Sequence, residues 1–531
     1  MAKPKVDYSL YLVTDSTPAV LKDPLQFFNV VEQALSGGVT IVQLREKTAD
    51  TGELISIAKK LHELTRKYGV PLLINDRVDV ALAVGCEGVH IGQDDMDLKT
   101  ARKLLGDDKI IGVTVSNVEE ALKACEDGAD YLGIGTVYAT PTKTNTKSII
   151  GAAGVREILT SMDSAGYYEK VKTVCIGGLN KNNIPRILYQ SQHFGDKPSV
   201  LVLNGVAVVS AIMSADDPEE ASRELLTLVD SWHKFRGSAL IGLRAERGVL
   251  GAVGDIIKRV HEERPLTHNM TNLVVQNFAA NVALAVGGSP IMANYGEEAA
   301  DLSKLGGSLV VNMGTVTPEG LLNYYRALQA YNVAVQPVVF DPVGAGATSL
   351  RREAVKSILS NGYLDVIKGN EGEIKTVWGA VDGEQQKGVD SSDSLTPEDK
   401  LDLVVKLARR EQNVVVMTGK TDYVSDGYWT ATIANGHEYL GLVTGTGCTL
   451  GTAISVALAA YHKEDKLWAV VTAMLHFEIA AEIAAEREDV KGPGTFISAF
   501  LDELYNIRIA TVNGDVKWLE RAKGLHITLT R

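Results

Sequence analysis

The first ~230 residues alternate short apolar runs with longer segments in which apolar residues recur at helical spacing. The apolar runs have the length of buried strands, and segments such as 53–68 and 118–127 have the period of amphipathic helices. The eight predicted strands are residues 10–14, 40–44, 71–75, 88–92, 110–115, 131–136, 173–177 and 200–206. Eight strand–helix repeats in this length favour a closed (β/α)8 barrel of the TIM type, and a doubly wound sheet is the alternative.

A different pattern begins near residue 249, where longer helices alternate with strands and glycine-rich loops. Strands are predicted at residues 308–312, 335–341 and 414–417, which indicates a second α/β domain with an open sheet. We therefore expect a first domain over residues 1–235 ending in a helix at 218–232, a linker over 236–248, and a second domain over 249–531. The hydrophilic segment 381–400 is expected to be a surface loop.

The longest uncharged stretch covers residues 439–461 and is long enough to cross a membrane. Its glycines and threonines favour instead a glycine turn that leads into a buried helix at 449–461. The N-terminus is too polar for a signal peptide. The four cysteines (Cys86, Cys125, Cys175 and Cys448) are widely spaced, which argues against disulfides or a zinc site. We expect a soluble cytoplasmic protein that does not bind a membrane.

Composition and charge narrow the classes of function. The chain has 531 residues with ordinary globular proportions, 45% apolar and 22% charged. Its formal net charge is −13 and it has no run rich in Lys or Arg, so a nucleic-acid partner is not expected. Any phosphate binding must come from local features of an acidic protein.

Polar residues gather where the predicted barrel strands end. Asp76 and Asp95 follow the third and fourth strands, and two carboxylates beside substrate phosphates are suited to Mg²⁺. Arg45, Lys47 and Lys143 could hold a multiply charged anion. A separate phosphate site is expected at Gly177-Gly178 and Gly205, near the seventh and eighth strands. Each feature alone is common in turns and on solvated surfaces. Because the strand ends of a barrel form one rim, their joint placement there favours a functional site.

The segments YLVTD, VQLREK, LINDRVDVALAVGCEGVHIGQDD and GADYLGIGTVYATPTK resemble the thiamine-phosphate synthase family over residues 8–225. This resemblance implies that a pyrimidine diphosphate loses pyrophosphate and is captured by the nitrogen of a thiazole phosphate. The implied residues are Gln43, Arg45, Lys47, Asn75, Thr114 and Lys143 for the pyrimidine diphosphate, with Arg45 and Lys143 catalytic, Asp76 and Asp95 for Mg²⁺, and Thr140, Thr142, Gly178, Val209 and Ser210 for the thiazole phosphate.

The second domain contains DPVGAGAT (341–348), KGNEGE (368–373), MTGKTD (417–422) and VTGTGCTLG (443–451). Glycines before the apolar helix make its free N–H groups an anion site suited to a phosphoryl group. Asp341 and Glu373 could hold Mg²⁺ through water. Cys448, at the start of the helix, is expected to have a lowered thiol pKa.

These segments, with LTHNMTNLVVQNFAANVALAVGGSPIMA, resemble the hydroxyethylthiazole kinase family of the ribokinase-like fold over about 260–455. The resemblance implies ATP as co-substrate and phosphorylation of a thiazole alcohol. The implied residues are Asn272, Met292 and Gly445 for the thiazole, Lys368, Asn370 and Thr418 for ATP, Asp341 and Glu373 for the metal, and Cys448 as the catalytic residue facing the reacting hydroxyl. Whether Cys448 acts as a general base is left open.

Together the two resemblances imply a fused, bifunctional enzyme of thiamine biosynthesis, an arrangement similar to that of fungi. The expected partners are small molecules: the thiazole alcohol, the thiazole phosphate, the pyrimidine diphosphate and ATP. Two alternatives remain, a protein with one inactive half and a vitamin-sensing binding protein. The family resemblance also implies a homo-oligomer based on trimers, with a hexamer as one arrangement.

Overall fold

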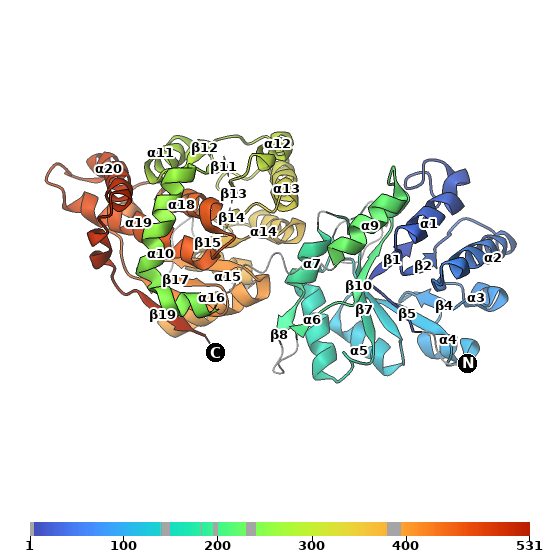
Figure 1. Ribbon diagram of the computed structural model, residues 1–531. Coiled ribbons are helices and arrows are strands. Elements are labelled where there is room, and N and C mark those ends of the chain that lie inside the picture. The colour runs from blue at the N-terminus through green and yellow to red at the C-terminus, as the bar shows by residue number, and fades with distance from the viewer. Residues whose placement is uncertain are drawn as a thin grey trace. The chain divides into compact units, whose positions relative to one another are not determined.

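The computed structural model describes residues 5–138, 140, 149–181, 183–194, 200–229, 241–379 and 394–530. The chain divides into two compact units, residues 1–235 and residues 236–531. We call them the barrel unit and the sheet unit and describe each by itself (Figure 1).

Eight parallel strands close the barrel unit. Their order around the barrel is β1-β10-β7-β6-β5-β4-β3-β2, so the predicted (β/α)8 barrel is confirmed and the open sheet is wrong for this unit. The barrel strands are β1 (Leu10–Val13), β2 (Ile41–Leu44), β3 (Leu72–Asn75), β4 (Gly88–Ile91), β5 (Ile110–Val115), β6 (Tyr131–Ile134), β7 (Lys172–Ile176) and β10 (Gly205–Val208).

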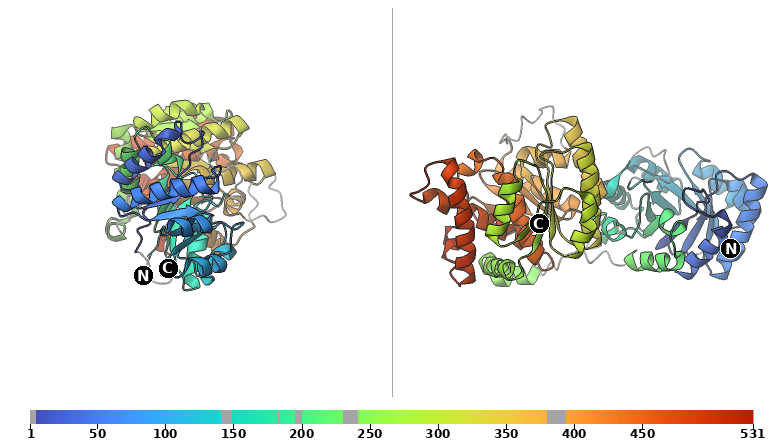
Figure 2. Two further views of the ribbon diagram at one scale, coloured as in Figure 1. Left: turned by 90° about the vertical axis from the view of Figure 1, so that its right-hand side faces the viewer. Right: turned by 90° about the horizontal axis from the view of Figure 1, so that it is seen from above.

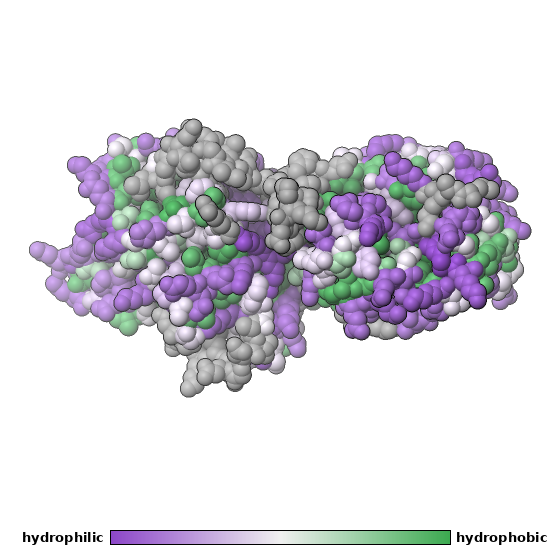
Figure 3. Space-filling view, turned by 90° about the horizontal axis from the view of Figure 1, so that it is seen from below, coloured by the Kyte–Doolittle hydropathy of each residue, from purple (hydrophilic) through white to green (hydrophobic). Residues whose placement is uncertain are grey.

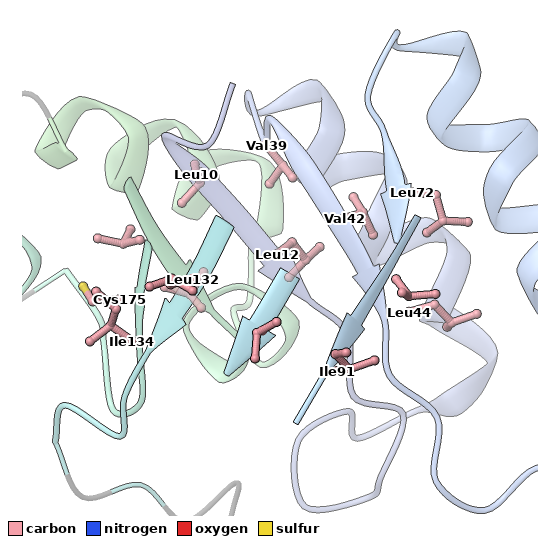
Figure 4. Packing of buried hydrophobic residues seen from close by; sticks show 14 of the residues in the cluster. Leu10, Leu12, Val39, Val42, Leu44, Leu72, Ile91, Leu132, Ile134 and Cys175 are labelled. Carbon is pink, nitrogen blue, oxygen red and sulfur yellow. The ribbon is translucent and has the colours of Figure 1, made fainter. Parts of the chain in front are cut away.

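Helices surround the barrel and bury one face of each strand. Leu10 and Leu12 of β1 point outward and pack in the layer between strands and helices, where Figure 4 shows them near Val42 and Leu44 of β2. The alternate residues point inward, as strand geometry requires. The surrounding helices are α1 (Phe27–Ser36), α2 (Thr51–Lys67), α3 (Val78–Val84), α4 (Leu98–Leu105), α5 (Val118–Glu126), α6 (Gly151–Ser164), α7 (Ile184–Gln190), α8 (Ser210–Met213) and α9 (Pro218–Val229).

The eighth barrel strand differs from the prediction. The predicted strand at 200–206 is wrong, because β9 (Val200–Leu201) pairs with β8 (His193–Phe194) in a separate hairpin. The barrel is closed by β10, which pairs with β1 and β7. Gly205 therefore lies at the N-terminal end of β10, opposite the rim, and its expected phosphate role is wrong.

The sheet unit is built on a nine-stranded mixed sheet in the order β12-β11-β13-β14-β15-β16-β17-β18-β19. Strands up to β16 pair in parallel, and the last three pair antiparallel. The strands are β11 (Leu266–Met270), β12 (Ser289–Ile291), β13 (Ser308–Asn312), β14 (Val338–Asp341), β15 (Val366–Asn370), β16 (Val414–Thr418), β17 (Asp422–Ser425), β18 (Trp429–Ile433) and β19 (His526–Leu529).

Helices cover both faces of this sheet, as the two views of Figure 2 show. One core includes α10 (Ile241–Glu263), α11 (Gln276–Val286), α18 (Thr446–Tyr461), α19 (Lys466–Glu486) and α20 (Pro493–Val512). The other core includes α12 (Ala299–Lys304), α13 (Pro318–Val333), α14 (Ser349–Asn361), α15 (Glu371–Trp378) and α16 (Pro397–Glu411). The short helix α17 (Tyr439–Leu442) leads to the glycine turn before α18. The predicted open α/β sheet is confirmed.

Two predicted irregular segments are partly helical. Residues 241–248 of the expected linker belong to α10, and residues 397–400 of the expected surface loop begin α16. Thr396 caps α16 by accepting a hydrogen bond from the N–H of Asp399. Residues 236–240 and 381–393 of these segments lie outside the described residues.

Hydrophilic residues occupy much of the face in Figure 3, with apolar residues in scattered groups. Among the described residues, α19 is the one helix long and apolar enough to cross a membrane, and 94% of its most apolar stretch is buried inside the unit. That burial is typical of a core helix. Cys86, Cys125 and Cys175 are free thiols buried in the core of the barrel unit.

Candidate active sites

An acid pair lies at the rim where the barrel strands end. Asp76 directly follows β3 in a left-handed conformation (φ 62°), and its N–H donates to the carbonyl of His90 at 2.8 Å. Burial raises the pKa of Asp76 to about 6, and the hydrogen bond and charge of Asp95 add to this shift. The charge of Lys47 and a hydrogen bond from Asn75 oppose it.

Two carboxyl groups this close repel each other when both are ionised, so they need a shared proton or a cation between them. Oxygen donors of this kind suit Mg²⁺. One oxygen of Asp95 accepts the N–H of Gly92 at 2.7 Å, which fixes its orientation. The residues at this rim therefore fit the expected metal. Within the described part of the chain there is no group of three or more His, Cys, Asp or Glu side chains that could hold a metal alone.

Arg45 extends the rim from the end of β2. Its guanidinium forms a 2.6 Å ion pair with the buried Asp15, and its backbone N–H donates to Thr14. This pairing holds one cationic side chain in place at the rim, while Lys47 is exposed. Asp15 was not among the predicted site residues, although it follows β1 just as Asp76 follows β3. The position of Asp15 after a predicted strand is the sequence feature that could have identified it as a site residue.

Gln43 and Thr114 lie near the C-terminal ends of β2 and β5, on either side of the acid pair. The amide Nε2 of Gln43 donates to the hydroxyl of Tyr11 at 2.7 Å. The hydroxyl of Thr114 contacts Nε2 of His90 at 2.8 Å. Both predicted residues are therefore anchored from below by side chains that sequence reasoning did not select.

The expected thiazole-phosphate residues come from the loops after β7 and β10. Gly178 follows β7 with a φ of 66°, a left-handed conformation that favours glycine. Its carbonyl accepts a hydrogen bond from Asn183 at 2.9 Å. Val209 and Ser210 come directly after β10, so these three residues share the rim.

The loop after β6 was expected to supply Thr140, Thr142 and Lys143. Thr140 is partly buried. Thr142 and Lys143 lie outside the described residues, so their contribution stays a prediction.

The sheet unit brings Asp341 and Lys368 together at the carboxyl ends of β14 and β15. Lys368 Nζ lies 3.1 Å from Asp341 Oδ2 and donates to the carbonyl of Gly447 at 2.8 Å. Burial favours the neutral form of Lys368, but the charge of Asp341 prevails and raises the pKa of Lys368. The other carboxylate oxygen of Asp341 is buried and has no hydrogen-bond partner among the described residues. An unpartnered buried carboxylate oxygen fits a bound cation or its water.

Asn312, at the end of β13, connects this ion pair to the predicted thiazole residues. Its Nδ2 donates to Asp341 at 3.0 Å, and its Oδ1 accepts from Asn272 at 3.0 Å. Asn272 also donates to the sulfur of Cys448 at 3.6 Å. The structure therefore unites Asn272, Cys448, Asp341 and Lys368 around Asn312, which was not predicted although it ends a buried strand.

The expected lowering of the Cys448 pKa is wrong. Cys448 does lie in the first turn of α18, but its thiol is mostly buried. That burial raises the pKa of Cys448 to about 11, the charge of Asp341 acts in the same direction, and Lys368 opposes both. The thiol is therefore protonated at neutral pH, and it can accept or donate a hydrogen bond rather than remove a proton.

Glu373 and Asn370 form a reciprocal cap at the start of α15. Asn370 Oδ1 accepts the N–H of Glu373 at 2.9 Å, and Glu373 Oε2 accepts the N–H of Asn370 at 2.8 Å. The second oxygen of Glu373 accepts the N–H of Gly344 at 2.8 Å, which ties α15 to the loop after β14. Burial raises the pKa of Glu373 to about 7, and Asp341 adds to the shift. With both oxygens engaged, Glu373 suits a contact to a metal through water.

The remaining predicted residues surround this centre. Gly445 is the N-cap of α18 with a φ of 95°, and a Cβ there would lie 2.3 Å from Val275. Thr418 ends β16, beside Asn370 in the register of the sheet. Met292 follows β12 and is partly buried.

Two protein families match the chain, one in each unit. The Thiamine monophosphate synthase family model matches residues 10–212. The Hydroxyethylthiazole kinase family model matches residues 257–510.

Relatives span the whole chain. The "Probable thiamine biosynthetic bifunctional enzyme" of Schizosaccharomyces pombe is 43% identical and covers 98% of this chain and 99% of its own length. The "Thiamine biosynthetic bifunctional enzyme" of Saccharomyces cerevisiae is 37% identical, covering 95% and 96%. Among solved structures, the hydroxyethylthiazole kinase of Pyrococcus horikoshii is 36% identical over 52% of this chain and 99% of its own, with a TM-score of 0.45.

Proposed function

Because the chain belongs to the family of thiamine biosynthetic bifunctional enzymes, we propose that its two sites catalyse consecutive reactions with the residues described above. It is a thiamine-phosphate synthase fused to a hydroxyethylthiazole kinase. The observation that carries the residue assignment is that each unit holds a carboxylate centre and a cationic side chain at the carboxyl ends of its strands.

In the sheet unit, the kinase site phosphorylates 4-methyl-5-(2-hydroxyethyl)thiazole with ATP. Asn272, Met292 and Gly445 bind the thiazole alcohol, and Cys448 lies beside its hydroxyl. Lys368, Asn370 and Thr418 contact ATP. The contact of Lys368 with Gly447 places its ammonium at the N-terminus of α18, where the free N–H groups favour a transferring phosphoryl group.

In this site, preorganised charge is the main source of catalysis. Lys368 is already held by Asp341 and Gly447, so little reorganisation is needed as negative charge develops. The raised pKa of Cys448 argues against a thiolate base. We infer that Cys448 orients the hydroxyl of the substrate.

In the barrel unit, the synthase site joins the resulting thiazole phosphate to 4-amino-2-methyl-5-hydroxymethylpyrimidine diphosphate. Gln43, Arg45, Lys47, Asn75, Thr114 and Lys143 bind the pyrimidine diphosphate, and Thr140, Thr142, Gly178, Val209 and Ser210 bind the thiazole phosphate. Pyrophosphate leaves as a carbon–oxygen bond breaks, and Arg45 and Lys143 stabilise the charge on the departing oxygens. The thiazole nitrogen then captures the pyrimidine carbon.

Mg²⁺ at both sites would neutralise phosphate charge and polarise the departing group. Asp76 and Asp95 would hold it in the barrel unit. Asp341, directly, and Glu373, through water, would hold it in the sheet unit. Two observations support this assignment: the hydrogen bond and charge of Asp95 raise the pKa of Asp76, and one buried carboxylate oxygen of Asp341 has no hydrogen-bond partner among the described residues.

We further propose domains over residues 1–235 and 249–531 joined by 236–248, a cytoplasmic location and a trimer-based homo-oligomer. The division after Phe235 supports the first boundary. Residues 241–248 of the proposed linker lie in helix α10.

The function is tested by supplying the thiazole alcohol, ATP and the pyrimidine diphosphate and measuring pyrophosphate. Release that requires all three substrates supports both activities. Release from thiazole phosphate without ATP, together with no ADP from the alcohol, would assign only the synthase.

A further inference from the structure

A chain of hydrogen bonds crosses the interior of the barrel below the rim. Gln43 Nε2 donates to the hydroxyl of Tyr11 at 2.7 Å, and that hydroxyl lies 2.8 Å from the hydroxyl of Tyr131. Tyr131 in turn lies 2.7 Å from Nδ1 of His90, whose Nε2 lies 2.8 Å from the hydroxyl of Thr114. The chain therefore connects two of the residues assigned to the pyrimidine diphosphate through three that have no assigned role.

Two glycines leave room for the rings in the middle of this chain. A Cβ on Gly112 of β5 would lie 2.0 Å from the Tyr131 ring, and one on Gly133 of β6 would lie 2.9 Å from the His90 ring. Tyr11 and Tyr131 are almost completely buried. Burial raises the pKa of both phenols far above the usual value, so each keeps its proton. The two phenols in the middle of the chain are thus neutral and held in fixed positions.

With the neutral form of the His90 imidazole, the hydrogens along the chain all point the same way. With the amide of Gln43 donating to Tyr11, the hydrogen of Tyr11 is directed to Tyr131, and that of Tyr131 to Nδ1 of His90. His90 then carries its proton on Nε2 and donates to Thr114. The hydroxyl hydrogen of Thr114 is left to donate outside the chain, and the carbonyl oxygen of Gln43 is left to accept.

The opposite direction is the alternative for the same atoms. If the amide of Gln43 were turned over, each hydrogen bond would reverse, Gln43 would offer N–H and Thr114 would offer a lone pair. The two ends are therefore coupled: one presents an acceptor when the other presents a donor. A buried polar group without a hydrogen-bond partner in the middle of the chain would be energetically unfavourable. The hydrogen-bond directions at the two ends are therefore set together.

We propose that this chain fixes the donor and acceptor pattern that the synthase site presents to the aminopyrimidine ring, with Tyr131 as the positioning residue at its centre. The aminopyrimidine ring carries both an N–H donor and ring-nitrogen acceptors, which are complementary to the carbonyl of Gln43 and the hydroxyl of Thr114. This inference rests on the proposed synthase function.

Tyr131→Phe tests the inference, because it removes the central hydroxyl and keeps the ring. Tyr8→Phe is the matched control: Tyr8 is also buried, its ring lies 5.0 Å from that of Tyr131, and its hydroxyl is not part of the chain. Two neutral hydrogen bonds are lost in the first variant only. We expect its KM for the pyrimidine diphosphate to rise roughly tenfold or more, with the KM for thiazole phosphate changed less than about twofold.

A pyrimidine diphosphate that lacks the amino group distinguishes a loss of hydrogen bonding from a loss of packing in the Tyr131 variant. The wild type should prefer the amino substrate in kcat/KM, Tyr8→Phe should keep that preference, and Tyr131→Phe should lose most of it. An unchanged KM of Tyr131→Phe for the pyrimidine diphosphate would overturn the inference. So would an equal loss of kcat/KM on the pyrimidine diphosphates with and without the amino group. An inactive wild type would instead refute the proposed synthase function.

The proton position on His90 gives a second readout, which is measured on the wild-type protein. In ¹⁵N spectra of histidine-labelled wild-type protein, with the His90 signal assigned through His90→Gln, we expect the proton on Nε2. A proton on Nδ1 in the complex with the pyrimidine diphosphate would show the opposite direction and contradict the assignment.

Discussion

Replacing Lys368 by Met tests the buried ion pair of the kinase site. In the wild type the ammonium and the carboxylate of Asp341 are 4% and 1% exposed and 3.1 Å apart, so neither charge is solvated. The variant leaves Asp341 without its cation, and the amide of Asn312 remains as its hydrogen-bond donor. Breaking one partner of a buried pair typically costs about 3–5 kcal/mol.

That loss should lower the unfolding midpoint of the sheet unit by roughly 6–12 °C, since about 1 kcal/mol corresponds to a few degrees in units of this size. Tryptophan fluorescence follows mainly this unit, because four of the five tryptophans belong to it (Trp378, Trp429, Trp468 and Trp518) and Trp232 alone belongs to the barrel unit. Kinase activity should be lost, while synthase activity measured well below the midpoint should stay near that of the wild type.

The double variant Lys368→Met, Asp341→Leu is the matched control, because replacing both charges by apolar groups removes the unpaired carboxylate. It should recover most of the lost stability and no kinase activity. The single variant should also regain stability as the pH falls, because the isolated carboxyl then binds a proton more tightly in the folded state than in the unfolded state. A midpoint within about 2 °C of the wild type in Lys368→Met would show that the buried ion pair does not stabilise the sheet unit.

Further predictions concern both sites. Asp76→Asn should remove most synthase activity through loss of a Mg²⁺ ligand and leave kinase activity near wild type, and a parallel loss of kinase activity in folded protein would contradict the division of function. Cys448→Ala should lower kinase kcat by less than about tenfold with little change in the KM for ATP, because its raised pKa disfavours a base. A loss of ~10²–10⁴-fold, typical of a general base, would restore that role. Because Asp76 has a pKa of about 6 and Mg²⁺ needs its ionised form, the Mg²⁺ concentration for half-maximal synthase activity should rise as pH falls from 7 to 5, roughly tenfold per unit below 6. A requirement that is constant over this range would show that Asp76 does not bind the metal in that form.

Much of the fold was predictable because its strands are short apolar runs bounded by turns. The predictions at 110–115 and 308–312 match β5 and β13 to the residue. The eighth barrel strand was not, since Val200–Leu201 is as apolar as β10 and only its pairing with His193–Phe194 separates the two. The sequence pattern indicates which residues are buried, whereas the strand with which each strand pairs depends on how the barrel closes.

The candidate sites were predictable where a polar residue ends a strand, as Asp341 does, or directly follows one, as Asp76 does. Strand order then decides which of them meet, so the connection through Asn312 required the structure. The Cys448 pKa shows a second limit. Its place near a helix N-terminus is visible in the sequence, but the burial that outweighs the helix effect is not.

We expect the two sites to carry out consecutive reactions, with the thiazole phosphate diffusing freely from the kinase site to the synthase site. Asp76→Asn should lack only the synthase, and Asp341→Asn only the kinase. Neither variant alone should release pyrophosphate from the thiazole alcohol, ATP and the pyrimidine diphosphate. A mixture of the two should release it, at a rate that increases with the amount of either variant. No release from the mixture, although each variant keeps its remaining activity, would contradict the claim.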